Sequence, residues 1–319
     1  MRKLIIGIVI VVAAAVGAVW AFSTPDIPRG DLEAKYATAP SQFVTLPDGA
    51  RAHLRDQGPK DAPALILVHG SNASLFTWEP WTQRLDKKFR IIAVDMPGHG
   101  LTGAVPNGDY SQEGMVRFVK EIADKLGLDK FAIAGNSMGG GVAARFAEEY
   151  PDRVTHLILV DAAGMNTKFG DHVPLAFRLA RVPVVNQMML YVTPRSIVSE
   201  GLNDAIVHKE IITSAMIDSY WDFARMQGTR EATLARFELP MPAEIPHDIG
   251  KIKAPTLILW GEEDHLIPVE AAHAYANAIH GSKLVIYPHT GHLPQEEVAD
   301  QSASEVAKFL CASSGASNG

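Results

Sequence analysis

The sequence predicts an α/β fold with a mostly parallel sheet, and two patterns support this. Short apolar runs recur along the chain from residue 64, and uninterrupted runs of this length are typical of strands covered on both faces. Helical patterns separate the runs, as in residues 111–128 and in the alanine-rich residues 138–150 that stop at Pro151. Strands that alternate with helices indicate parallel pairing with right-handed crossovers. The runs are 64–70, 90–96, 131–137, 156–162, 256–262 and 283–289.

The strand–helix core is predicted in two pieces, residues 42–164 and 251–312. It starts with two strands joined by a turn at residues 47–49, Pro-Asp-Gly. Between the two pieces, residues 165–250 hold several helix-like segments and no strand-like run, which predicts a helical cap over the carboxyl edge of the sheet. Residues 27–41 combine prolines with small polar residues and are predicted to be a linker.

The first 26 residues differ from the rest of the chain. Arg2 and Lys3 precede residues 4–22, which carry no charge. An apolar stretch of this length, at ~1.5 Å per residue, nearly crosses a hydrocarbon layer of ~30 Å. We expect an uncleaved membrane anchor with the folded part outside the cytoplasm, periplasmic or extracellular. The alternative is a signal peptide over residues 1–26 and a secreted protein, although Val19-Trp20-Ala21 is a poor cleavage site.

Charge and cysteine content exclude some classes of function. The net charge is −7 and no long basic run is present, which argues against a nucleic-acid partner. Cys311 is the single cysteine, so neither an internal disulfide nor a CxxC metal site can form.

One serine lies where a nucleophile is expected. Gly135-Asn136-Ser137-Met138-Gly139 fits the pattern G-x-S-x-G, and it stands between a predicted strand and a predicted helix. Such a turn forces a strained backbone at the serine, and glycines leave room for it. The alternative for Ser137 is a capping residue at a glycine-rich helix start.

A histidine and an aspartate complete a catalytic set. Asp264 and His292 each follow a predicted strand, so the chain order is Ser, Asp, His. Parallel strands bring the three side chains to one edge of the sheet, where His292 would accept the serine proton and Asp264 would orient the imidazole. The rival bases are His265 and His289, and the rival acids are Glu263 and Asp161.

Two backbone amides are expected to bind the oxyanion. The first is the N–H of Met138, directly after the nucleophile, and the second comes from the loop at residues 69–74. We assign the second donor to Ser71, with Asn72 as the alternative. His69 is expected to brace this loop.

These motifs together resemble the α/β-hydrolase superfamily over residues 42–310. "LVHG", "DMPGHGLT", "GNSMGG", "WGEEDHLIP" and "GHLPQEE" occur in the order of that family. Within it, the chain is similar to bacterial lipases and carboxylesterases with a helical cap. The resemblance implies an eight-stranded sheet, a Ser-His-Asp triad and no cofactor.

Other members of the superfamily differ at specific residues. Dehalogenases and epoxide hydrolases use an aspartate where this chain has Ser137. Carbon–carbon hydrolases of aromatic ring-cleavage products share "GNSMGG" and are the alternative, although "HGSNAS" and "GHLPQ" depart from their usual patterns. Serine perhydrolases and a non-catalytic binding protein on this fold are further alternatives. Residues 98–103 match G-x-G-x-x-G, but Pro106 and Gly108 break the helix that a dinucleotide site needs.

The expected function is hydrolysis of a small-molecule carboxylic ester through an acyl-enzyme. The cap is rich in methionine and aromatic residues, which suit an apolar acyl group as well as they suit ordinary packing. The candidate substrate-binding residues are Met188, Met189, Trp221 and Phe223.

Overall fold

A computed structural model describes residues 17, 23–165, 178, 182, 185–239 and 248–312 of the chain. Within these residues, no helix has the length and apolarity that a membrane span requires. The predicted anchor, residues 4–22, lies outside them apart from Gly17.

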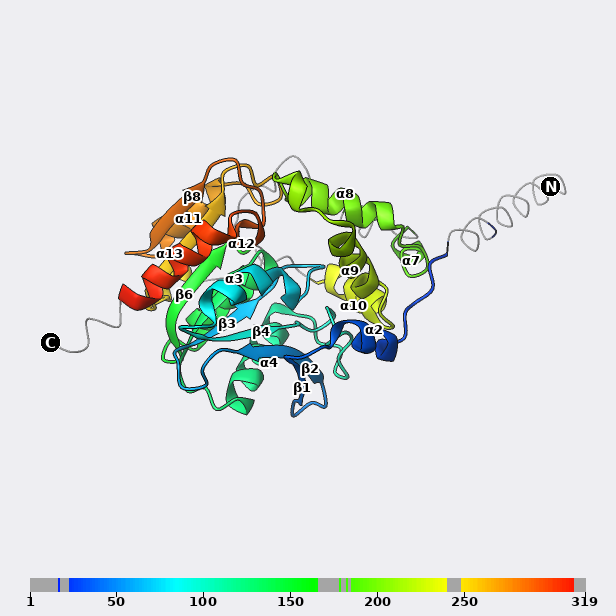
Figure 1. The fold of residues 1–319 in the computed structure, drawn as a ribbon, viewed down its shortest axis with the longest axis horizontal. Coiled ribbons are helices and arrows are strands. Elements are labelled where there is room, and N and C mark those ends of the chain that lie inside the picture. The colour runs from blue at the N-terminus through cyan, green and yellow to red at the C-terminus, as the bar shows by residue number, and fades with distance from the viewer. Residues whose placement is uncertain are drawn as a thin grey trace.

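An eight-stranded sheet forms the centre of the molecule, in the order β1-β2-β4-β3-β5-β6-β7-β8 (Figure 1). β1 is antiparallel to β2 and β2 is antiparallel to β4, while the other neighbours are parallel. The strand–helix alternation predicted from the apolar runs is therefore confirmed. The strands are β1 (Ser41–Thr45), β2 (Arg51–Gln57), β3 (Ala64–Val68), β4 (Arg90–Val94), β5 (Phe131–Asn136), β6 (Val154–Val160), β7 (Thr256–Gly261) and β8 (Lys283–Tyr287).

Helices cover both faces of the sheet, which explains why the central strands are apolar without interruption. In β3, Ile66 belongs to the buried cluster that includes side chains of α4, α5 and α11, whereas Leu65 and Leu67 belong to the cluster with α3 and α13. Alternate residues of one strand thus enter opposite cores. These helices are α3 (Glu79–Leu85), α4 (Gln112–Lys125), α5 (Met138–Glu149), α11 (Glu270–Ala278) and α13 (Ala299–Ala312).

The segment between β6 and β7 is helical where the structure describes it. Its helices lie beside the carboxyl edge of the sheet and are separate from the two helical layers (Figure 1). They are α7 (Val185–Met188), α8 (Arg195–Ala205), α9 (Ser214–Ala224) and α10 (Thr229–Phe237). The described residues also contain short helical turns: η1 (Leu75–Trp78), η2 (Lys209–Ile211), η4 (Ile249–Lys251) and α12 (Pro294–Glu297).

The predicted linker contains a helix, α2 (Arg29–Tyr36), that binds both the cap and the core. Leu32 is buried in a cluster with Leu101 of the core and with Phe223 and Met226 of the cap. Arg29 donates hydrogen bonds to the carbonyls of residues 101 and 102, at 2.6 and 2.9 Å. The proline-rich composition indicated a linker, but one buried leucine and these polar contacts hold α2 in place.

The sheet register aligns the loops that carry the candidate site residues. Val68, the last residue of β3, pairs with Gly135 of β5, so the loop after β3 begins beside the turn that holds Ser137. The candidate acid and base follow β7 and β8 at the same edge.

Candidate active site

Ser137 occupies a strained turn between β5 and α5. Its φ and ψ are 54° and −121°, a region that side chains with a Cβ rarely adopt. Backbone bonds hold this conformation: the Ser137 carbonyl accepts from the amides of residues 140, 141 and 163, and the Ser137 amide donates to the carbonyl of residue 160. Gly139 packs so closely on β3 that a Cβ there would lie 2.2 Å from the Val68 carbonyl oxygen. The turn therefore presents the Ser137 hydroxyl at the carboxyl edge of the sheet.

His292 and Asp264 form a buried hydrogen-bonded pair. The Nδ1–H of His292 donates to Asp264 Oδ2 at 2.7 Å, and their side chains are 6% and 0% exposed. The other carboxylate oxygen of Asp264 accepts from the amides of residues 266 and 267, at 2.8 and 3.1 Å. Because Nδ1 is held by the carboxylate, Nε2 is the imidazole nitrogen left to accept a proton.

Ser137 and His292 line the same cavity. In the part of the chain that the structure describes, the Ser137 hydroxyl makes no hydrogen bond to the imidazole. Catalytic hydrogen bonds are often long without substrate and shorten in the complex. The candidate acid Asp264 is thus bonded to the candidate base His292, and His292 lines the same cavity as the candidate nucleophile Ser137.

Asp161, the rival acid, lies next to this pair but makes no hydrogen bond to the imidazole among the described residues. Carboxylate oxygens of Asp161 and Asp264 and a ring nitrogen of His292 all lie within 4.8 Å of one another. Burial and then the charge of Asp264 raise the pKa of Asp161 well above its ordinary value. A raised pKa favours the neutral carboxyl, which is a poorer partner for an imidazolium than a carboxylate is. Asp161 Oδ1 accepts the amide of Gly261 at 2.9 Å.

The remaining rivals lie away from the cavity. The side chain of His289 is 84% exposed and its Nδ1 lies 3.0 Å from Glu263 Oε1. This rival base and this rival acid therefore pair with each other. His265 is also exposed. The residues that would replace His292 as the base are thus at the surface.

The loop after β3 reaches Ser137, as an oxyanion loop must. A Cβ on Gly70 would lie 3.0 Å from Ser137 Cβ, and Ser71 and Asn72 both line the cavity. Among the described residues, neither amide of this pair donates to a protein acceptor, so both are available to a ligand. The amide of Met138 is the first of α5 and has no partner within the helix. The structure leaves the choice between the Ser71 and Asn72 amides open.

His69 braces this loop. Its Nδ1–H donates to the carbonyl of Gly70 at 2.7 Å and its Nε2 accepts the amide of Met96 at 3.0 Å. Burial lowers the pKa of His69, which suits the neutral ring that these two bonds require.

Two residues with contacts at the site were not identified from the sequence. Asn136 precedes the nucleophile, is buried, and donates to the carbonyls of Val160 and His292, at 3.2 and 3.0 Å. It thereby ties the His292 loop to the strand that carries Ser137. Arg236 of α10 contacts the oxyanion loop from the cap. Asn136 could have been identified because it lies inside the G-x-S-x-G pattern. No sequence pattern marks an arginine of the cap as a contact of the site.

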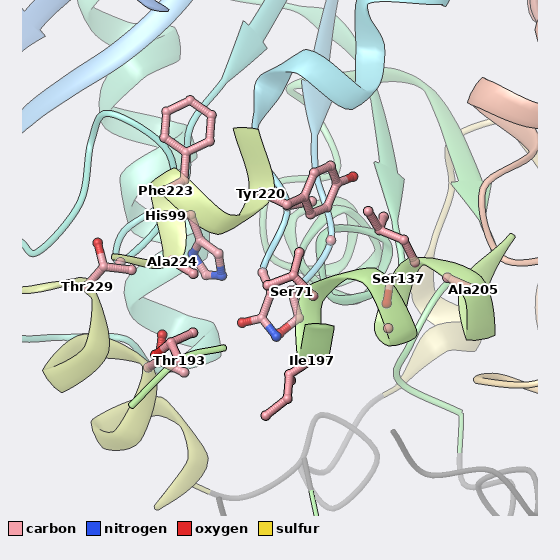
Figure 2. Close-up of a pocket in the computed structure, with 18 of the residues that line it drawn as sticks. Ser71, His99, Ser137, Thr193, Ile197, Ala205, Tyr220, Phe223, Ala224 and Thr229 are labelled. Carbon is pink, nitrogen blue, oxygen red and sulfur yellow. The ribbon is translucent and has the colours of Figure 1, made fainter. Parts of the chain in front are cut away.

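The cavity lies between the cap and the core and has a volume of about 240 Å³. Its wall is mainly aliphatic and aromatic. Figure 2 shows Ser71 and Ser137 together with the cap residues Ile197 and Tyr220. The Tyr220 hydroxyl is buried and has no hydrogen-bond partner in the described chain. The apolar lining residues are Met189, Val192, Ile197, Val198, Leu202, Phe223, Leu234, Leu266 and Leu293.

The structure places two of the four candidate substrate-binding residues at this wall. Met189 and Phe223 line the cavity. Met188, the last residue of α7, is not among the residues that line the cavity and is 42% exposed. Trp221 does not line it either: its indole N–H donates to the carbonyl of Thr193 at 2.7 Å, and Arg225 lies over its ring. Residue type identified apolar side chains, but which of them line the cavity depends on contacts that only the fold determines.

Residues 98–103 form a tight loop, as expected from Pro106 and Gly108. The amide of Gly98 donates to the carbonyl of Gly103 at 2.7 Å, and no described helix starts there. The helix N-terminus that a pyrophosphate requires is therefore missing at this loop.

A family model described as the alpha/beta hydrolase fold matches residues 63–299. The chain belongs to this family. It follows that the protein is an α/β-fold hydrolase.

Similar proteins carry two kinds of activity in their names. A 2-hydroxy-6-oxononadienedioate/2-hydroxy-6-oxononatrienedioate hydrolase of Klebsiella pneumoniae is 28% identical over 288 residues, which are 85% of this chain and 96% of that protein. The structure of a meta-cleavage product hydrolase from Pseudomonas fluorescens IP01 is 25% identical with a TM-score of 0.73, over 85% of this chain and 98% of that one. A thermophilic esterase from Thermogutta terrifontis is 26% identical with a TM-score of 0.70, over 85% and 98% of the two chains. The curated relative's name favours carbon–carbon hydrolysis, the alternative of the sequence analysis, over ester hydrolysis.

Asp264 and Asp161 should respond oppositely to the same substitution. Asp264→Asn removes the charge that orients and stabilises the His292 imidazolium, and we expect kcat to fall by ~10⁴-fold. Asp161→Asn introduces an amide that is neutral and isosteric with the carboxyl, whose raised pKa favours its own neutral form, and we expect kcat to stay within about threefold. Steady-state kinetics on one ester substrate compares the pair. Equal losses in both variants would show that Asp161 shares the role of the acid.

Gly139 and Gly30 test the close packing at the Ser137 turn. Gly139→Ala forces a Cβ against the Val68 carbonyl, so we expect at least tenfold lower activity and a free energy of unfolding lowered by about 1–3 kcal/mol. Gly30→Ala is the matched control, because nothing lies within 4 Å of that Cβ on α2. It should leave activity unchanged and stabilise by at most about 1 kcal/mol. Urea unfolding and kinetics of both variants decide, and a fully active Gly139→Ala enzyme would refute the packing argument.

Proposed function

We propose that the protein hydrolyses carboxylic esters with an apolar acyl group through an acyl-enzyme on Ser137. The observation that carries this proposal is the mainly apolar cavity that Ser137 and His292 both line. Asp264 supports the base through the 2.7 Å hydrogen bond to its Nδ1. This set of groups is what acyl transfer to serine requires.

The reaction follows from the positions of these groups. Nε2 of His292 takes the proton of Ser137 as Oγ attacks the ester carbonyl carbon, and the carbonyl π electrons move to oxygen. The amides of Met138 and of Ser71 or Asn72 bind this oxyanion. His292 gives its proton to the departing alcohol, and the carbonyl re-forms as the acyl-enzyme. Water, deprotonated by His292, then releases the carboxylic acid and restores Ser137.

The charges at the cavity wall support an ester rather than a carboxylate-bearing substrate. The named substrate of the Klebsiella relative is a dioate, and such an anion needs a cation that is free to pair with it. Arg230 is the one lysine or arginine in the described wall. Its guanidinium already donates to the carbonyls of residues 190 and 24, at 2.8 and 2.7 Å, and lies 3.4 Å from Asp26. An apolar acyl chain requires no such partner, and the Thermogutta relative is named an esterase.

Carbon–carbon hydrolysis is the second candidate, and the names of the relatives favour it. The same serine, base and oxyanion donors would act on a ketone. The bond between the carbonyl carbon and its neighbour would break, with water supplying OH to the acyl carbon and H to the leaving carbon. The two candidates therefore differ in the substrate that the cavity accepts.

We also propose that residues 4–22 attach the protein to a membrane, with the folded part outside the cytoplasm. The apolar length and the preceding positive charges support this. The residues that follow are bound to the cap: the amide of Thr24 donates to the carbonyl of Tyr191 at 2.8 Å. An anchor would therefore hold the cap close to the membrane surface.

A series of p-nitrophenyl esters of increasing acyl length, run beside a 2-hydroxy-6-oxo-dienoate, tests the main proposal. We expect kcat/KM to rise with acyl length until the cavity is filled, and little cleavage of the dienoate. Ser137→Ala should lower kcat by roughly 10⁶-fold, and the exposed Ser304→Ala is the matched control. Efficient cleavage of the dienoate with slow ester hydrolysis would instead support carbon–carbon chemistry.

Removal of residues 1–22 tests the attachment. We expect the full chain in the membrane fraction after high-salt washing and the truncated chain in the soluble fraction, because burial of apolar side chains is insensitive to salt. Immunoblots of both fractions measure this. A full chain that is soluble and shortened by the mass of the apolar segment would identify a cleaved signal peptide.

A further inference from the structure

Arg236 joins the cap to both predicted oxyanion donors. It lies on α10, and its Nη2 donates to the side-chain carbonyl of Asn72 at 3.1 Å while its Nη1 donates to the Ser71 hydroxyl. The same Nη1 lies 3.8 Å from the Met138 sulfur. One guanidinium therefore contacts the residues on either side of the oxyanion position.

The environment of Arg236 leaves its positive charge unneutralised by these contacts, since a hydroxyl, an amide oxygen and a thioether are all neutral. Burial lowers the pKa of Arg236 to about 10, so the side chain is a cation at neutral pH. Its field reaches the neighbouring loops, where burial and then the Arg236 charge lower the pKa of His99 well below its ordinary value. The same positive charge that disfavours a protonated His99 would stabilise an anion that forms near these loops.

The loop that Arg236 holds has a strained backbone. Asn72 has a φ of 60°, a conformation that asparagine tolerates better than most residues but that still needs support from its surroundings. The Asn72 side chain obtains this support from Arg236, and the amides of Ser71 and Asn72 remain unbonded. The guanidinium thus fixes the side chains of the loop and leaves its N–H groups to the ligand.

We propose that Arg236 is a positioning residue of the oxyanion hole, which holds the Ser71–Asn72 loop and stabilises the oxyanion by its charge. This inference rests on the proposed serine-hydrolase function and deepens it. It makes the oxyanion hole dependent on the cap, because α10 must be docked on the core for the guanidinium to reach the loop. A residue that merely tied the cap to the core would not affect the ionisation of an oxyanion.

Three variants separate these roles. Arg236→Met keeps the aliphatic length and removes the charge, and Arg236→Lys keeps the charge without the two-pronged contact. Arg195→Met is the matched control, since Arg195 is also a cap arginine but contacts Asp218 and Ser214 within the cap. We expect kcat of Arg236→Met to fall roughly 10- to 100-fold, less than or equal to the loss of a direct oxyanion donor. KM should change less than about threefold, with partial recovery of kcat in Arg236→Lys and no effect of Arg195→Met.

A trifluoromethyl ketone with an apolar chain gives the direct readout. Ser137 Oγ forms a bond to the ketone carbon, the carbonyl π electrons move to oxygen, and the hydroxyl proton passes to His292. The resulting hemiketal titrates between its neutral form and its oxyanion, and the ¹⁹F chemical shift reports the pKa of that step. We expect this pKa to rise by about one unit or more in Arg236→Met, the counterpart of a tenfold loss in kcat.

Each outcome has a distinct meaning. A raised hemiketal pKa with lowered kcat and partial recovery in Arg236→Lys supports the inference. An unchanged hemiketal pKa in Arg236→Met overturns it, whether kcat is retained or lost, because the remaining role is structural. Should Arg236→Met fail to fold, Arg236→Gln, which also removes the charge, takes its place, and a hemiketal pKa equal to that of Arg195→Met overturns the inference. A wild-type chain that forms no adduct, while a phosphonate also leaves Ser137 unlabelled, contradicts the proposed function itself.

Discussion

The strained turn at Ser137 is the constraint on which the arrangement of the site depends. A positive φ at a residue with a Cβ costs about 1–3 kcal/mol and persists only where the surroundings impose it. Here the surroundings are the backbone bonds to the Ser137 carbonyl and amide, whose partners are in α5, at the last residue of β6 and at residue 163 just after β6. The parallel sheet supplies the rest, because β3, β5, β7 and β8 end at the same edge. The turn can be maintained only by a complete core, which ties the chemistry to the stability of the fold.

The two aspartates at this edge show how environment assigns roles to identical side chains. Asp264 accepts three hydrogen bonds, from two amides and from the imidazole. Asp161 lies beside it in a fully buried position, where a second negative charge would be costly. Both residues follow a strand, so their positions in the sequence do not show which one is the partner of His292. Their hydrogen-bond partners, which depend on the fold, distinguish the two.

Much of the fold could be predicted from the sequence, because it follows from local patterns. The apolar runs of the central strands and the turn at residues 47–49 depend on neighbours close in the chain, and the structure bears them out. Asp264 and His292 could be placed at one edge because parallel strands share a direction. The exposure of Met188, the hydrogen bond of Trp221 to Thr193 and the docking of α2 could not be predicted. The last two depend on contacts between residues more than 20 positions apart in the chain.

Arg236 lies on the cap, whereas the residues that it contacts at the site belong to the core. An apolar cavity excludes water and thereby strengthens every remaining electrostatic interaction, favourable or not. Two amides in such a cavity leave the developing oxyanion with partial positive charges only, whereas a cation fixed behind them adds a full one at no cost of reorganisation during the reaction. A cation within the acyl cavity would pair with substrate or product carboxylates. Arg236 is not among the residues that line the described cavity, and it is bound to Ser71 and Asn72, which do line it. Under the proposal above, its field would reach the oxyanion without a further cation in the wall.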